Sequence, residues 1–147
     1  MPYTKIWIHL IWSTKNRERI ITKEIKPLLL AHIKENAKNK GIHIDVVNCV
    51  QDHIHLVASL GRDQTIGKIV QLIKGESSNW CNKQKILQTK FEWQDEYIVV
   101  SVSHSMIDKV REYINNQEEH HKRKSFMEEY EDFKNKYGFE SIAVKAE

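Results

Sequence analysis

The chain has 147 residues, 40% of them hydrophobic and 29% charged, with only 5 Gly and 2 Pro, which suits one folded domain and excludes collagen-like, low-complexity and disordered proteins. Its net charge of +3 is by itself too small to demand a nucleic-acid partner. No apolar run approaches the roughly 18 to 20 residues of a membrane span, no secretory signal opens the chain and its two cysteines form no disulfide framework, so we expect a cytoplasmic protein without a membrane partner.

The first predicted element is a strand at residues 5–12, where β-branched and aromatic side chains follow one another. A polar, basic loop at residues 13–19 comes next. From Thr22 onward, helical spacing of apolar residues predicts a helix, with Pro27 in its first turn and Gly41 as its stop signal. The apolar positions of this helix are Ile25, Leu28, Leu29, Ile33 and Ala37.

Two further strands, at residues 42–50 and 53–60, are separated by Gln51-Asp52 and predict a hairpin. A second helix follows the candidate N-cap Thr65. Its apolar stripe consists of Ile66, Ile69, Val70, Ile73, Ser77, Trp80 and Cys81.

A fourth strand is predicted at residues 97–103 and a last helix at residues 126–137. Between them, Ser105 followed three residues later by Asp108 predicts a third helix that opens with a capping box. The apolar face of this helix consists of Met106, Ile107, Val110 and Ile114.

This β-α-β-β-α-β order, followed by helices, predicts an α+β, ferredoxin-like fold. Two crossover helices should cover one face of an antiparallel sheet, and the other face is left for the C-terminal helices, a bound partner or a second subunit. We expect one domain over residues 1–147, with a core at about residues 3–137 and a tail after residue 138.

The third predicted strand carries two histidines on one face, because side chains alternate along a strand. His53 and His55 share that face with Val57 and Ser59, while the other face is entirely apolar. The two imidazoles are close enough to share a metal ion. By itself this spacing is weak, and two strand histidines without a ligand would be the more common case.

The third helix places Tyr113 and Gln117 one turn apart at the edge of its apolar face. If this helix packs on the histidine face, a metal held by two imidazoles and an amide could polarise a phosphodiester. Tyr113 is then placed to attack, since a phenol with a pKa of about 10 needs a nearby cation or base. Hydrolysis by a metal-bound water, or a purely structural Tyr113 and Gln117, are the alternatives.

The sequence resembles a known family at these residues. DHIHL at residues 52–56 matches the His-hydrophobic-His motif of HUH endonucleases, and YINNQ at residues 113–117 is similar to the tyrosine helix of the single-tyrosine HUH transposases, which include the REP-associated tyrosine transposases. The similarity runs from Tyr3 to about Tyr137 and includes HLIW at residues 9–12.

The resemblance implies a metal-dependent transposase that nicks and rejoins single-stranded DNA at element ends in a bacterial or archaeal cell. It implies His53, His55 and Gln117 as ligands of Mg²⁺ or Mn²⁺, and Tyr113 as the nucleophile of a 5′-phosphotyrosine intermediate. It also implies DNA hairpins as the recognised partner, a homodimer, and no small-molecule cofactor.

Two other functions fit the same residues: a domesticated protein that binds nucleic-acid hairpins without moving DNA, and a replication or mobilisation initiator that shares the HUH site. For DNA binding, basic residues in the first ninety positions are the candidates, although they also suit an ordinary solvated surface. These candidates are Lys15, Arg17, Arg19, Lys68 and Lys74.

Overall fold

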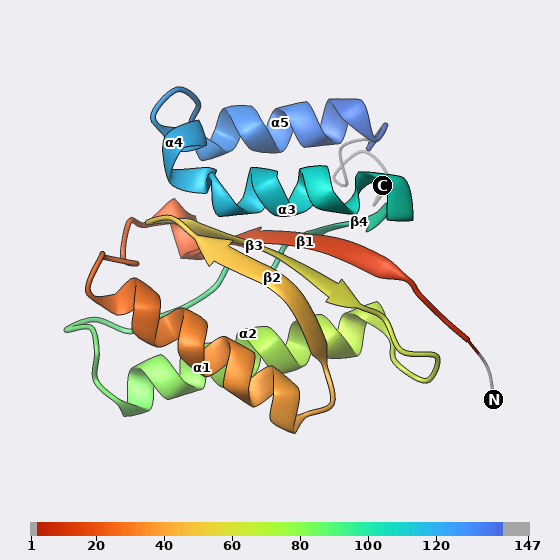
Figure 1. Ribbon diagram of the computed structural model, residues 1–147. Coiled ribbons are helices and arrows are strands. Elements are labelled where there is room, and N and C mark those ends of the chain that lie inside the picture. Colours follow the sequence, from red (N-terminus) through yellow and green to blue (C-terminus); the bar gives the residue numbers. More distant parts are fainter. Residues whose placement is uncertain (1–2, 140–147) are drawn as a thin grey trace, which may run out of the picture. The chain divides into compact units, whose positions relative to one another are not determined.

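The computed structural model describes residues 3–139, which fall into two compact units, divided after Gln117. The first unit contains the sheet and its covering helices (Figure 1). The second contains most of α4 (Gln117–His121) and all of α5 (Phe126–Lys136). The single domain expected from the sequence stays a prediction.

A four-stranded antiparallel sheet with the strand order β2-β3-β1-β4 forms the centre of the first unit. This order and the two crossover helices confirm the predicted α+β, ferredoxin-like fold. All seven residues of the central strand β1 are buried, as expected for a strand covered on both faces. The strands are β1 (Trp7–Ser13), β2 (His43–Cys49), β3 (His53–Ser59) and β4 (Ile98–Val102).

The helices α1 (Ile25–Asn39) and α2 (Ile66–Lys83) cover one face of the sheet and bury the main core against it (Figure 1). The hydroxyl of Thr65 accepts a hydrogen bond from the backbone N–H of Lys68, which confirms the predicted N-cap of α2. Leu28, one of the apolar positions of the predicted helix, lies outside the core. Its side chain is 55% exposed, because it lies 100° around the helix from the buried Leu29.

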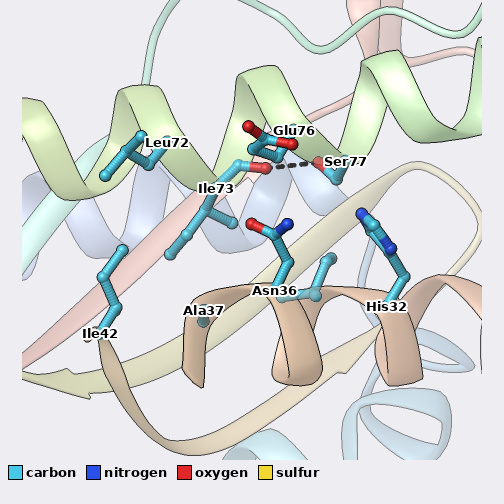
Figure 2. Close-up of a pocket in the computed structure, with 9 residues that line it drawn as sticks. His32, Asn36, Ala37, Ile42, Leu72, Ile73, Glu76 and Ser77 are labelled. Atoms are coloured by element: carbon cyan, nitrogen blue, oxygen red, sulfur yellow. Dashed lines mark hydrogen bonds between the residues drawn. The ribbon is translucent and has the colours of Figure 1, made fainter. Parts of the chain in front are cut away.

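The space between α1 and α2 contains a cavity of about 10 Å³, lined in part by the side chains of His32 and Asn36, which point from α1 toward α2 (Figure 2). It has room for about one water molecule, so it excludes a nucleotide-sized ligand. The ring of His32 stacks on Trp80 with 4.4 Å between ring centroids. Trp80 therefore packs against the core, as the helical stripe predicted.

The opposite face of the sheet is covered by α3 (Ile107–Asn115), which directly follows the short 3-10 turn η2 (His104–Met106). Another 3-10 turn, η1 (Lys15–Arg17), follows β1. A second core forms where α3 meets the sheet, with Trp7, Val57, Ile107 and Ile114 as its buried members. The first unit thus uses its own helix to cover the histidine face.

Two details of the start of α3 differ from the prediction. Met106 is 41% exposed, because it belongs to η2 and precedes the helix. The capping box is also wrong: no side chain caps the helix, and Asp108 instead accepts a hydrogen bond from Arg111 at 2.9 Å. The 3-10 turn is closed by the backbone, with the N–H of Met106 donating to the carbonyl of Ser103.

Polar side chains of β2 fasten α3 to the sheet. Asp45 accepts two hydrogen bonds from the Arg111 guanidinium, at 2.7 and 2.8 Å, a bidentate geometry. The amide of Asn48 donates to the carbonyl oxygen of Ile114 at 2.8 Å. These contacts satisfy backbone and charged groups at the helix surface, so they fix where α3 lies along β2.

We expect Asp45→Asn to weaken the fold at neutral pH and to do so less as the pH falls. The hydrogen bond from Arg111 holds the pKa of the Asp45 carboxyl below its ordinary value of 3.8. A lowered folded-state pKa contributes stability above the unfolded pKa, and this stability is lost as the pH falls through the folded-state value. Urea unfolding of both proteins at about pH 7 and about pH 3 should show the difference shrinking at the acidic pH; a constant difference would contradict the ion-pair explanation.

In the second unit, the helix α5 confirms the last predicted helix, and the hydroxyl of Ser125 caps it by accepting from the backbone N–H of Glu128. The buried carboxylate of Glu129 lies 3.4 Å from Nε2 of His120 and 3.3 Å from Nε2 of His121. Across residues 3–139, no helix is long and apolar enough to cross a membrane.

Candidate active site

The two strand histidines lie fully buried on the face of β3 that α3 covers. Both side chains are 0% exposed. A ring nitrogen of His53 lies within 4.8 Å of one of His55, a separation that one bound ion can bridge. The side chains of Ile54, Leu56 and Ala58 point the other way, into the main core with α1 and α2. The alternation expected from the sequence is therefore confirmed.

Tyr113 and Gln117 approach these histidines from the end of α3 and the residue that opens α4. The Tyr113 ring stands edge-on to His55, with 5.6 Å between ring centroids and an angle of 83°. The Oε1 atom of Gln117 lies 3.4 Å from Nε2 of His53, and its amide donates to the Tyr113 carbonyl at 3.3 Å. One chain therefore brings together all four predicted residues, whose chemical roles stay predictions.

A carboxylate that the sequence analysis assigned no role orients His53. The Oδ1 atom of Asp52 lies 2.8 Å from Nδ1 of His53. A carboxylate accepts hydrogen bonds, so it favours the tautomer with the proton on Nδ1 and a lone pair on Nε2. That lone pair is on the nitrogen nearest Gln117. The backbone carbonyl of Asp52 accepts from the N–H of Thr14 at 2.8 Å, which holds the hairpin turn against the end of β1.

His9 is the second residue whose place the sequence analysis missed. Its side chain is 2% exposed on β1, and its Nε2 atom lies 2.9 Å from Nδ1 of His55. In the antiparallel register His9 pairs with Val57 and Ile11 pairs with His55, so His9 lies diagonally across from His55 on the same face. Only this register reveals the contact, because 46 positions separate the two histidines in sequence.

The donor set fits a divalent transition-type ion. Two buried imidazoles and one amide oxygen offer three ligands. The carboxylate of Asp52 beside Nδ1 of His53 favours the tautomer in which Nε2 carries the lone pair that coordination needs. Mn²⁺ accepts nitrogen ligands more readily than Mg²⁺, which prefers oxygen, and phosphate oxygens would have to complete either shell.

The five predicted DNA-binding residues differ in their surroundings. Lys15 forms an ion pair with Glu92 at 2.9 Å, which raises the pKa of the lysine through a hydrogen bond. Arg17 has a left-handed backbone with φ 54° in an exposed basic turn. Arg19 and Lys68 are exposed. Their contribution to DNA binding stays a prediction.

Lys74 is placed differently from the other four. Its ammonium donates to the carbonyl oxygens of Gln94 and Asp95, and it lies 5.9 Å from the ring centroid of Trp12 and 5.8 Å from that of Tyr97. Burial lowers the pKa of this lysine. Lys74 thus connects α2 to the segment that leads into β4.

We expect Lys74→Met to lower the free energy of unfolding by about 1 kcal/mol, since it removes hydrogen bonds from backbone carbonyls. Lys68→Met, on an exposed part of the same helix, is the matched control and should leave stability unchanged. Chemical denaturation compares the two, and hydrogen exchange should become faster near residues 94–97 in the first variant alone. Equal behaviour of both variants would contradict a structural role for Lys74.

Comparisons with known proteins converge on one family. The sequence model described as "Transposase IS200 like" matches residues 2–117. The chain is 26% identical over 115 residues to the ISDra2 transposase TnpA of Deinococcus radiodurans. The aligned region covers 74% of this chain and 81% of that protein. The family match includes the sheet, both strand histidines and the tyrosine helix.

Solved structures agree with this comparison. A candidate transposase from Deinococcus radiodurans aligns with a TM-score of 0.65 at 25% identity, over 79% of this chain and 93% of that chain. A REP-associated tyrosine transposase bound to a REP hairpin shares the fold, with a TM-score of 0.62 at 17% identity, over 82% of this chain and 72% of that chain.

Proposed function

Because the chain belongs to the IS200-like transposase family, we propose that it nicks and rejoins single-stranded DNA at element ends through Tyr113. The observation that carries this proposal is a pair of contacts within one chain. The half-buried phenol ring of Tyr113 contacts His55, and Gln117 contacts His53. A nucleophile beside groups that can hold a cation is the arrangement that phosphoryl transfer to a tyrosine needs.

In the proposed reaction, the Tyr113 oxygen attacks the scissile phosphorus. A bond forms between phosphorus and the phenolic oxygen, and the bond from phosphorus to the 3′ oxygen breaks. The phenol loses its proton and the departing 3′ oxygen gains one, so the products are a 5′-phosphotyrosine and a free 3′ hydroxyl. Attack by a 3′ hydroxyl on this link rejoins a strand without ATP, because the phosphodiester energy is kept.

His53, His55 and Gln117 would hold the divalent ion, Mg²⁺ or Mn²⁺, that the family resemblance implies. When bound, the ion supplies Lewis-acid polarisation of the phosphate. The side chains of this protein position the reacting groups: Asp52 orients His53, and the amide of Gln117 donates to the Tyr113 backbone. Burial of both histidines excludes water from their rings and strengthens the electrostatic contacts at the site.

We further propose that the DNA partner carries hairpins near the element ends. One structural neighbour was solved with a REP hairpin, and the exposed basic residues Arg17, Arg19 and Lys68 offer phosphate contacts. A homodimer, which the resemblance implies, stays part of the proposal. In this chain the tyrosine helix covers its own sheet.

The test incubates the protein with labelled single-stranded oligonucleotides that copy the flanks of its own gene, with Mn²⁺, with Mg²⁺ or with EDTA. We expect a covalent protein–DNA adduct that survives denaturing electrophoresis and is absent with EDTA. Binding of the hairpin DNA without cleavage or linkage under either metal would overturn the proposal and favour a hairpin-binding protein. Adding a second end tests strand joining, and nicking without any joining would favour a replication or mobilisation initiator.

A further inference from the structure

We propose that Ser13 contacts the substrate, with its hydroxyl donating a hydrogen bond to a non-bridging oxygen of the scissile phosphate. The inference rests on the proposed function, in which Tyr113 attacks that phosphate. It assigns a role to a residue outside the motifs that carry the family resemblance. The sequence placed Ser13 in a polar loop, whereas in the structure it is the last residue of β1.

The strand register places Ser13 beside the candidate site. In the antiparallel pairing of β1 with β3, Ser13 lies opposite His53, and Ile11 lies opposite His55. Directly paired residues of an antiparallel sheet point to the same face, with Cβ atoms about 4.5 to 5.5 Å apart. The Ser13 side chain therefore lies on the face that carries both histidines, next to His53.

The hydroxyl of Ser13 is buried without a hydrogen-bond partner among the residues that the structure describes. Ser13 is 7% exposed. The two other buried hydroxyl groups in the described part of the chain are satisfied, because Thr14 donates to the carbonyl of Glu18 and Ser77 to that of Ile73, each at 2.6 Å. Burying a hydroxyl without a partner costs free energy. A bound phosphate oxygen supplies the partner that this hydroxyl lacks.

The backbone on both sides of Ser13 is fixed. Its carbonyl accepts a hydrogen bond from the N–H of Gln94 at 2.9 Å, and the N–H of Thr14 donates to the carbonyl of Asp52 at 2.8 Å. Ser13 is thus held between the start of β3 and the segment that leads to β4. A donor fixed in this way needs little reorganisation when substrate binds, which makes it effective at a phosphate on which charge develops during the reaction.

A serine hydroxyl suits a phosphate oxygen at this position. The proposed reaction brings a phosphodiester to the face that holds His53, His55 and Tyr113, and its non-bridging oxygens accept hydrogen bonds. Ser13 can donate to one of them and keep its own proton, whatever the protonation of the neighbouring imidazoles. Ile11, the next residue of β1 on this face, is apolar. Ser13 is therefore the β1 side chain that can donate a hydrogen bond beside His53.

A purely structural role for the hydroxyl explains less. The side-chain hydrogen bonds that close the turn after β1 come from Thr14, whose hydroxyl donates to the carbonyls of Glu18 and Asp52. An alanine at position 13 would fill nearly the same space and bury no polar group. The strand itself thus gains nothing from the hydroxyl of Ser13.

The experiment uses the full-length protein with Ser13→Ala, which removes the hydroxyl, and Ser13→Thr, which keeps it. Ser59→Ala is the matched control, because Ser59 lies on the same face at the other end of β3, about 20 Å from His53 by the strand rise. Single-turnover formation of the covalent adduct with Mn²⁺ measures the rate. Binding of a short single-stranded oligonucleotide with Mn²⁺, in proteins that also carry Tyr113→Phe, measures affinity without cleavage.

We expect Ser13→Ala to slow adduct formation by about 10-fold to 100-fold and to weaken oligonucleotide binding by about 10-fold, because it removes a hydrogen bond to a charged group. Ser13→Thr should keep most of the rate and the affinity, and Ser59→Ala should keep all of both. The affinity for Mn²⁺ should be the same in all these proteins, since Ser13 is not a proposed ligand. An unchanged rate and affinity in Ser13→Ala would overturn the inference.

Sulfur substitution at the scissile phosphate identifies the contact itself. Sulfur accepts hydrogen bonds weakly, so one of the two phosphorothioate diastereomers should react more slowly with the wild type, by a factor that largely disappears in Ser13→Ala. Equal sulfur effects in both proteins for both diastereomers would overturn the inference. A wild type that reacts equally well with both diastereomers and with the oxygen substrate would do so even if Ser13→Ala did not fold.

The binding measurement separates this inference from the proposed function. If the wild type formed no adduct, the proposed reaction would fail. Weaker oligonucleotide binding in Ser13→Ala, with normal binding in Ser59→Ala, would still support a phosphate contact at Ser13. Equal binding in both variants would overturn it.

Discussion

Tyr113→Phe is expected to abolish the covalent DNA adduct and to reduce nicking by at least about 1,000-fold. The substitution removes only the phenolic oxygen, which in the proposed reaction forms the bond to phosphorus. No other group on the aromatic ring can replace it as a nucleophile. Denaturing electrophoresis of labelled oligonucleotides with Mn²⁺ measures the adduct and the nicked product together.

The same substitution should leave the rest of the site in place. Phe keeps the ring that stands edge-on to His55 and, at 6.4 Å between ring centroids, to His9. We therefore expect the free energy of unfolding to change by less than about 0.5 kcal/mol and hairpin binding to persist. Tyr97→Phe, at a tyrosine that is 39% exposed, is the matched control and should form the adduct normally. An adduct that persists in Tyr113→Phe would assign the nucleophile to another residue.

A mixing experiment extends this prediction to the origin of the tyrosine. In the structure, Tyr113 contacts His55, and Gln117 contacts the neighbouring ligand His53, within one chain. If that arrangement is the active one, a mixture of Tyr113→Phe and His53→Ala proteins should remain inactive, since each chain lacks one essential group. Recovery of the adduct in the mixture would show that the tyrosine helix of one chain completes the site of another.

The fold could be predicted because its signals are periodic and local. The alternation along β3 separates the histidines from the apolar core, and the helical stripe after Thr65 identifies α2. Gly41, with φ 74°, ends the α1 segment where the sequence indicated. Such signals depend on neighbours within a few positions, so one sequence is enough to read them.

The errors arise where distant residues decide the outcome. The apolar stripe of α1 includes both Leu28 and Leu29, but the position of α2 and the sheet determines that Leu29 alone is buried. Similarly, Ser105 and Asp108 have the spacing of a capping box, yet Arg111 lies near enough to engage the carboxylate instead. A sequence pattern indicates which residues could be buried or could cap a helix, and the packing of the whole unit determines which of them do so.

In the candidate site, too, local patterns predicted some residues, whereas others depend on contacts between distant parts of the chain. Motif spacing and the family resemblance identified His53, His55, Tyr113 and Gln117, and the structure brings these four together. His9 and Asp52 were assigned no role, because their contacts depend on strand register and on the geometry of a turn. The signal available for His9 was a histidine on another predicted strand, at a position that could face the same side of the sheet as His55. Without the pairing of the two strands, His9 could not be distinguished from an ordinary buried histidine.

Ile114→Ala is the second large effect that we expect, and it tests how the tyrosine is held. Ile114 is 0% exposed, follows Tyr113 directly and packs in the second core with Trp7 and Val57. Truncating a fully buried isoleucine to alanine commonly costs about 2 to 5 kcal/mol. The helix α3 spans nine residues, too few to remain helical alone in water, so its position depends on this contact.

Leu29→Ala provides the matched comparison. Leu29 is equally buried and also lies on a helix, but α1 packs on the opposite face of the sheet. Both variants should lose similar stability in chemical denaturation. Only Ile114→Ala should accelerate hydrogen exchange selectively at residues 107–115 and lower the adduct yield, because a helix that leaves the sheet takes Tyr113 away from His55. If both variants lost adduct equally while remaining folded, the position of the tyrosine would depend on overall stability rather than on the second core.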